Sequence, residues 1–115
     1  MNLSDVVQKL GLEVLAGQGA LTAEVRGGYA SDLLSDVIAH GREGDLWVTL
    51  QTHMNIVAVA SMKDMAGIVL VNGRRPEADT LQKAGMENVV LLVSMLPTFE
   101  LVGRLYRLGL SGERT

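Results

Sequence analysis

The chain has no cysteine among its 115 residues, and aromatic side chains are few. The absence of cysteine excludes a disulfide framework, zinc sites with cysteine ligands and thiol catalysis. One Phe, one Trp and two Tyr stand beside a hydrophobic fraction of 48%, so the core must be built from aliphatic side chains. Such a core is typical of strands that are covered on both faces, as in a parallel sheet between helices.

Basic charge is scarce as well. The formal net charge is −3, and Lys and Arg form no cluster with interleaved aromatic residues, so nucleic acid is not an expected partner. The longest apolar runs, such as residues 89–93, are far shorter than the roughly 20 residues that span a bilayer. Residues 1–5 have neither the basic region nor the apolar core of a signal peptide. We therefore expect a cytoplasmic protein that binds neither nucleic acid nor a membrane.

Helix and strand patterns alternate along the chain with short connections. Apolar strands are predicted at residues 46–50, 66–71 and 89–93, and amphipathic helices separate them. Strand–helix–strand alternation predicts right-handed βαβ units and a mostly parallel sheet. We expect one α/β domain over residues 1–110, in two or three layers, with shorter edge strands from the amino-terminal third. Residues 111–115 are expected to form a flexible tail.

Several residues are predicted to punctuate these elements. Residues 31–32 and Thr52 are expected to cap the helices that follow them, and Pro76 fits the first position of another helix. The glycine pair at residues 27–28 lies inside a predicted strand, which suggests a bulge or a close approach of another backbone segment.

Known catalytic and cofactor motifs are missing. The chain has no P-loop, no dinucleotide-binding glycine pattern and no Gly-x-Ser-x-Gly elbow. His40 and His53 are not spaced as a metal-binding pair, so we expect no metal site and no cofactor. His53 is the only candidate for acid–base catalysis, and nothing in the sequence supplies a group to orient it. We therefore expect a protein that is not an enzyme.

Polar residues gather where the predicted parallel strands end. Residues 51–55 join a strand to the amino end of a helix, where free backbone N–H groups and the helix dipole favour an anion. Ligands of open parallel sheets bind beyond the carboxyl ends of the strands, and the next strands deliver residues 72–75 and a serine to the same edge. Their guanidinium, imidazole and amide groups suit a phosphate or a carboxylate. The candidate ligand-binding residues are Gln51, Thr52, His53, Asn55, Asn72, Gly73, Arg74, Arg75 and Ser94.

Structural roles compete with this interpretation. Thr52 is a natural helix cap, and Asn72 with Gly73 is typical of a tight turn that needs positive φ. Arg74 and Arg75 are then solvated loop charges.

A second functional hypothesis is a protein-interaction or assembly subunit, acting as a homodimer or with another protein. The mean hydropathy is positive, and the predicted terminal helix from Thr98 carries Phe99, Val102, Leu105 and Tyr106 on one stripe. Apolar surface left over after folding is typical of an interface.

Several segments together resemble the DRTGG domain family, over nearly the whole chain. They are Leu-Gly-Leu-Glu-Val-Leu at residues 10–15, the glycines at 27–28, Gly-Asp-Leu at 44–46, and Ala-Gly-Ile-Val-Leu-Val-Asn-Gly at 66–73. In that family an Asp-Arg pair follows the middle strand and the next strand ends in Thr-Gly-Gly. In this chain residues 51–53 stand where the Asp-Arg pair would be. Residues 71–73 replace Thr-Gly-Gly, and of that motif Gly73 is retained.

The resemblance implies a fold similar to the amino-terminal domain of HPr kinase/phosphorylase. It also implies an accessory or regulatory role, since the family accompanies CBS domains or phosphotransacetylase elsewhere. The P-loop of HPr kinase lies in a separate domain that has no counterpart here, so kinase activity is not implied. We therefore expect a non-catalytic regulatory module that binds a nucleotide or a phosphorylated metabolite at the carboxyl edge of the sheet.

Overall fold

Five strands form one mixed sheet in the computed structural model, which describes residues 1–113. The strand order is β1-β5-β4-β3-β2; β1 runs antiparallel to β5, and the other neighbours are parallel. The prediction of an α/β fold with a mostly parallel sheet is confirmed. In chain order the elements are α1 (Leu3–Leu10), β1 (Glu13–Ala16), a 3₁₀ turn η1 (Gln18–Ala20), β2 (Gly27–Ala30), α2 (Leu34–His40), β3 (Asp45–Thr49), α3 (Asn55–Met62), β4 (Gly67–Leu70), α4 (Ala78–Met86), β5 (Leu91–Val93) and α5 (Thr98–Arg107).

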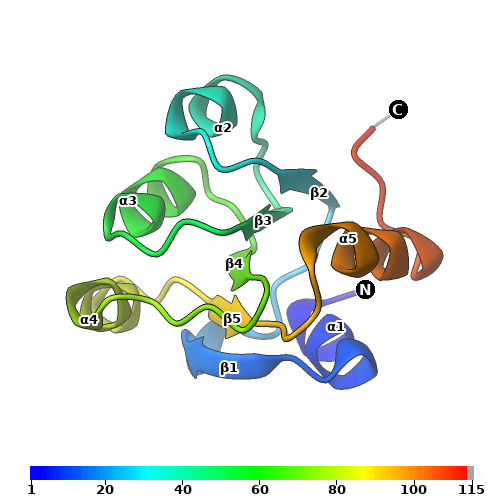
Figure 1. Cartoon of the computed structure of the whole chain (residues 1–115), viewed down its shortest axis with the longest axis horizontal. Helices are drawn as coiled ribbons and strands as arrows, with labels where there is room; N and C mark the ends of the chain where they lie inside the picture. Colours follow the sequence, from blue (N-terminus) through cyan, green and yellow to red (C-terminus); the bar gives the residue numbers. More distant parts are fainter. Residues whose placement is uncertain (114–115) are drawn as a thin grey trace.

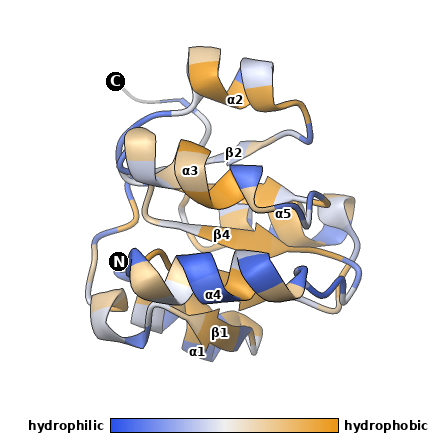
Figure 2. Ribbon diagram, turned by 90° about the vertical axis from the view of Figure 1, so that its left-hand side faces the viewer, coloured by the Kyte–Doolittle hydropathy of each residue, from blue (hydrophilic) through white to orange (hydrophobic). Residues whose placement is uncertain are grey.

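The helices cover both faces of the sheet, which gives three layers (Figure 1). Helices α2, α3 and α4 pack on one face, around Trp47 and Ile68. Helices α1 and α5 pack on the other, around Leu46 and Val69. Successive residues of a central strand thus point to opposite faces of the sheet, and both faces are buried. This explains why the central strands are unbroken apolar runs in the sequence. Figure 2 shows both hydrophilic and hydrophobic residues along α4, whose Leu81 and Met86 side chains are exposed.

Two helices follow the sequence closely. Helix α3 buries Ile56, Val57, Val59 and Ala60, the apolar residues that recur at helical spacing in this segment. Helix α1 begins with a capping box, in which the Asn2 side chain accepts from the Asp5 backbone N–H and the Asp5 carboxylate accepts from that of Asn2.

The predicted caps at residues 31–32 and at Thr52 are wrong. Helix α2 begins at Leu34 without a side-chain cap. The Asp32 carboxylate instead accepts from the Thr49 hydroxyl at 2.9 Å and from the Leu50 N–H at 2.7 Å. It therefore ties the end of β2 to the end of β3. Helix α3 likewise has no side-chain cap from Thr52.

Helix α4 also begins later than predicted. It starts at Ala78, so Pro76 precedes the helix and does not occupy its first position. Its buried residues are Thr80 and Ala84, while the Leu81 side chain is exposed.

The glycine pair at residues 27–28 forms no bulge, because the register of β2 with β3 is continuous. The irregularity of the sheet lies in β1, between Val14 and Ala16. The alternative, a close backbone approach, is confirmed: the Gly28 N–H donates to the Ser111 carbonyl at 3.2 Å. Residues 110–112, here called the terminal strap, are thus held against the edge of β2. Residues 114–115 of the predicted tail lie outside the described residues.

The predicted apolar stripe of α5 is split between core and surface. Leu101 and Leu105 are the residues that enter the core. Phe99 is 92% exposed and Tyr106 58% exposed, so the helix keeps an apolar face in water.

Candidate functional site

The loops that follow β3, β4 and β5 lie at one edge of the sheet, as predicted, because these strands are parallel. The chain leaves β4 toward α4 on one face and β5 toward α5 on the other (Figure 1). Such a switch point is where open sheets usually bind ligands. Here backbone hydrogen bonds bridge the two loops, from Asn72 N–H to the Leu96 carbonyl at 2.9 Å and from Gly73 N–H to the Ser94 carbonyl at 2.8 Å.

The turn after β4 has a left-handed backbone. Asn72 and Gly73 are both left-handed, with φ of 56° and 64°. A Cβ atom on Gly73 would lie 2.8 Å from the Met95 sulfur. Ser94 is 3% exposed, and its hydroxyl accepts from the Leu96 N–H at 3.1 Å. Ser94 therefore stabilises the turn after β5 and offers nothing to a ligand in this conformation.

The junction of β3 with α3 uses its amides internally. The Asn55 N–H donates to His53 Nδ1 at 3.1 Å, and the Ile56 N–H donates to the His53 carbonyl at the same distance. The Val57 N–H donates to the Met54 carbonyl. The expectation of free helix amides is therefore wrong for residues 55–57.

The two residues before His53 also serve the fold. The Gln51 side-chain amide donates to the Asp32 carbonyl at 2.9 Å. The Thr52 carbonyl accepts from the Thr80 hydroxyl at 2.8 Å and from the Glu77 N–H at 3.2 Å. These bonds fix the loop that carries His53 against the start of α4.

The two arginines of the β4 loop differ in their partners. Arg75 binds the Glu13 carboxylate with two hydrogen bonds, of 2.7 and 3.1 Å. Hydrogen bonding to Arg75 lowers the pKa of Glu13, and the same contact raises the pKa of Arg75. Arg74 is exposed, and within residues 1–113 no carboxylate forms an ion pair with it. The exposed side chains at this edge therefore include one uncompensated guanidinium, together with His53 and Asn72.

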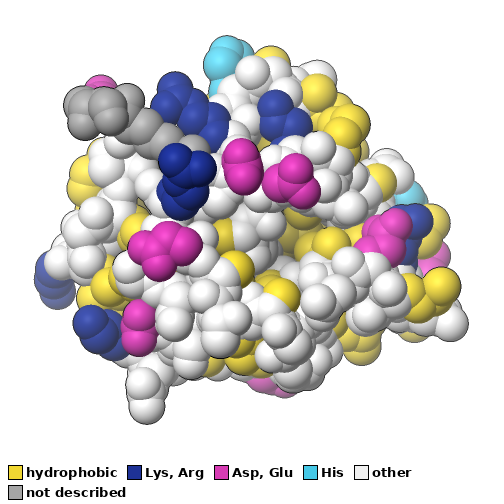
Figure 3. All heavy atoms as spheres, turned by 180° about the vertical axis from the view of Figure 1, so that it is seen from behind, with side chains coloured by type: hydrophobic (Ala, Val, Ile, Leu, Met, Phe, Trp, Pro, Cys, Tyr) yellow, Lys and Arg dark blue, Asp and Glu magenta, His cyan; other side chains and the backbone are white. Residues whose placement is uncertain are grey.

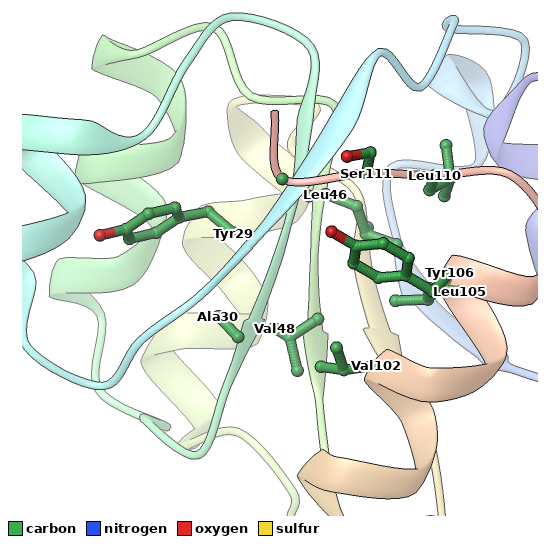
Figure 4. A pocket seen from close by; sticks show the side chains of 11 residues that line it. Tyr29, Ala30, Leu46, Val48, Val102, Leu105, Tyr106, Leu110 and Ser111 are labelled. Atoms are coloured by element: carbon green, nitrogen blue, oxygen red, sulfur yellow. The ribbon is translucent and has the colours of Figure 1, made fainter. Parts of the chain in front are cut away.

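A second candidate was missed by the sequence analysis. A groove of about 270 Å³ lies between α5 and the strands β2 and β3, with the terminal strap along one side (Figure 4). We call it the α5 groove. The spacing of Val102 and Tyr106 on one face of the helix was the signal in the sequence for this groove. The sequence did not predict the strap that completes it, because residues 111–115 were expected to form a flexible tail. Its lining is uncharged: Gly28, Tyr29, Ala30, Leu46, Val48, Val102, Leu105, Tyr106, Leu110, Ser111 and Gly112.

A third depression, of about 410 Å³, lies at the amino ends of the parallel strands. Glu24, Arg26, Glu43, Asp64 and Glu87 are among its lining residues. The rear view shows acidic and basic side chains beside a hollow (Figure 3). Within residues 1–113 no group of three or more His, Asp or Glu side chains is placed to hold a metal ion. No described helix is long and apolar enough to cross a membrane.

No protein-family model and no curated protein matches the chain. Among solved structures, it is similar to the CBS and DRTGG domains of the regulatory region of Clostridium perfringens pyrophosphatase, complexed with the activator diadenosine tetraphosphate. The TM-score is 0.73 over 96% of this chain, at 14% sequence identity. The chain spans 48% of the length of that protein chain. The likeness confirms, at the level of the fold, the resemblance to DRTGG domains.

Proposed function

We propose that the chain is a non-catalytic regulatory module that binds a nucleotide or another phosphorylated metabolite at the carboxyl edge of its sheet. The observation that carries the proposal is the position of Arg74. Its guanidinium projects from a turn that backbone hydrogen bonds hold rigidly, and no carboxylate of the described chain compensates it. Arginine on a fixed backbone is well suited to a phosphate, because its planar fork loses little entropy on binding.

Two neighbouring residues support the same edge. His53 is exposed on the adjacent loop, and its Nδ1 accepts the Asn55 N–H, which leaves the outer ring nitrogen for a ligand. The Asn72 side chain is exposed on the turn itself. The structurally similar pyrophosphatase region is regulatory and was solved with a nucleotide activator, which is consistent with a regulatory role on this fold.

The test is thermal denaturation of the purified chain with diadenosine tetraphosphate, ATP, AMP and inorganic phosphate. A ligand at 100 times its dissociation constant adds about 2.7 kcal/mol to the free energy of unfolding, which raises Tm by several degrees in a domain of this size. The shift should vanish in Arg74→Ala and should persist in Arg42→Ala, which removes an exposed arginine from the α2–β3 loop. If both variants lose the Tm shift equally, the shift depends only on net charge, and the proposed site is refuted. No Tm shift with any of the four ligands would also refute the proposal.

A second candidate function rests on the apolar face of α5, defined by Phe99, Val102 and Tyr106. Phe99 is the most exposed large hydrophobic side chain of the described residues, at 92%. We propose as the alternative that this face joins two copies of the chain in a homodimer. Sedimentation equilibrium should then show a dimer that Phe99→Ser weakens. The matched variant Met86→Ser, at a residue 79% exposed on α4, should leave the dimer unchanged. A monomeric wild-type chain at micromolar concentration would exclude this alternative.

A further inference from the structure

The α5 groove is bounded by the strands β2 and β3, by α5, and by the terminal strap that follows α5 in the chain. Leu46 and Val48 of β3 form its floor, Val102 and Leu105 of α5 form one wall, and the terminal strap forms the other. The groove exists because α5 lies over the middle of the sheet and stops short of the edge strand β2 (Figure 1).

The strap is fixed in place. The Leu110 N–H donates to the Leu105 carbonyl at 3.1 Å, which turns the chain back at the end of α5. Gly109, with φ of 102°, allows that reversal. One residue later, the Ser111 carbonyl accepts the Gly28 N–H of the edge strand. The wall that the strap forms is therefore hydrogen-bonded through its backbone to α5 and to β2.

The chemistry of the lining specifies what fits. Its side chains carry no charge, and the hydroxyl groups among them belong to Tyr29, Tyr106 and Ser111. The Tyr29 hydroxyl donates to Asp36 at 2.8 Å, and its ring points away from the groove (Figure 4). The Ser111 hydroxyl accepts from the Glu113 N–H at 3.0 Å. The Tyr106 hydroxyl remains for a ligand. A phosphate or carboxylate would lose its water here without meeting a positive charge, so this groove cannot be the site of the anionic ligand proposed above.

The volume sets the size of the occupant. An apolar protein cavity of about 150 Å³ is large enough for benzene, so about 270 Å³ accommodates a bicyclic ring or a branched aliphatic group of comparable size. Apolar pockets with a few polar groups at the rim are the usual form of small-molecule sites.

We propose that the α5 groove is a second ligand site, which binds the apolar part of a neutral small molecule, with a polar group of that molecule at the Tyr106 hydroxyl. The site is separate from the carboxyl edge in both position and chemistry. It therefore does not depend on the function proposed there.

Indole is a suitable probe, since it is neutral and bicyclic and has one N–H donor. Protein labelled with ¹³C in Leu and Val methyl groups would be titrated with indole and followed by NMR. Saturable shifts should be confined to the groove methyls, with a dissociation constant on the order of 1 mM for so small a ligand. The reporting methyl groups belong to Leu46, Val48, Val102, Leu105 and Leu110.

Two variants fill the groove from different sides. Ala30→Leu adds bulk from the edge strand, and Val102→Phe adds it from α5. Each should weaken indole binding about tenfold or more. Ala58→Leu is the matched control, since Ala58 is an exposed alanine of α3 on the opposite face of the sheet. An altered amide spectrum away from the groove would mean that a variant has changed the fold. The other filling variant would then be used for the test.

Shifts that do not saturate, that spread over both faces, or that survive both filling variants would overturn the proposal. The same methyl shifts produced by raising the protein concentration without indole would also overturn it, because the groove would then seat a second copy of the chain. Saturable binding that both filling variants remove and the control retains would establish the site.

Discussion

Replacing Gly17 with alanine should destabilise the fold far more than replacing Gly11, although both glycines are left-handed. Gly17 has a φ of 80° and Gly11 a φ of 63°. A Cβ atom on Gly17 would lie 2.6 Å from the Val90 Cα and 2.8 Å from the carbonyl carbon of Val89. These are backbone atoms of the segment that enters β5, so no side-chain rotation relieves the overlap. A Cβ atom on Gly11 would meet nothing within 4 Å.

The magnitudes follow from these two environments. A left-handed alanine costs roughly 1–2 kcal/mol, and restricting the unfolded chain returns about 0.4–1 kcal/mol. Gly11→Ala should therefore lower the free energy of unfolding by about 1 kcal/mol. Overpacking typically adds about 1–3 kcal/mol, so Gly17→Ala should cost about 2–4 kcal/mol. With about 4 °C of Tm per kcal/mol at this size, the expected drops in Tm are about 4 °C and 8–16 °C.

Urea denaturation followed by far-ultraviolet circular dichroism measures both variants beside the wild type. The slope of the transition should be unchanged for Gly11→Ala, and its midpoint should move much less than that of Gly17→Ala. Equal destabilisation of the two variants would refute the reasoning, because it would mean that β1 and β5 do not approach each other as closely as the structure shows.

Three further substitutions test particular contacts. Trp47 is fully buried and its indole N–H donates to the Ser31 carbonyl at 2.8 Å; Trp47→Phe should cost about 1–3 kcal/mol, and a smaller change in urea denaturation would argue against this bond. Thr80→Val keeps the side-chain shape but removes the hydroxyl that donates to Thr52; it should cost about 1 kcal/mol, so a stabilised variant would contradict the contact. Because the pKa of Glu13 is lowered from 4.5 by its hydrogen bond to Arg75, Glu13→Gln should be less stable than the wild type near pH 7. The difference should disappear as the pH falls below 4.5 through the lowered pKa, whereas a deficit that persists at low pH would rule out the ion pair as its cause.

The layered fold could be predicted because its cause is local in the sequence. Residues 66–71 are apolar without interruption, which identifies a strand buried on both faces, and the helical spacing of Ile56, Val57, Val59 and Ala60 identifies the face of α3 that packs on it. The cap at residues 31–32 failed for a reason that no local pattern contains. Once β2 pairs with β3, the Asp32 carboxylate reaches donors at the end of the neighbouring strand and leaves its own helix uncapped.

The candidate site was predicted in place but not in detail. Parallel strands bring residues 51–55, 72–75 and Ser94 to one edge whatever their exact contacts. The pairing of Asn72 with Leu96 and of Gly73 with Ser94 joins residues far apart in the sequence, and these bonds decide which polar groups remain exposed. The α5 groove was missed for the same reason, since it requires the strap to fold back onto Gly28.

The antiparallel pairing of β1 with β5 has a consequence for the order in which the molecule forms. Glu13 lies opposite Val93, so β1 pairs with β5, the strand farthest from it along the described residues. The βαβ units from β2 to β4 close short loops, whereas β1 pairs with a strand that lies beyond β2, β3 and β4 in the chain. Long loop closures slow folding, so α1 and β1 should dock after the rest of the sheet. Hydrogen exchange should then detect their release as the first partial unfolding of the native state, and such an opening would free Arg75 from Glu13 without disturbing the central strands.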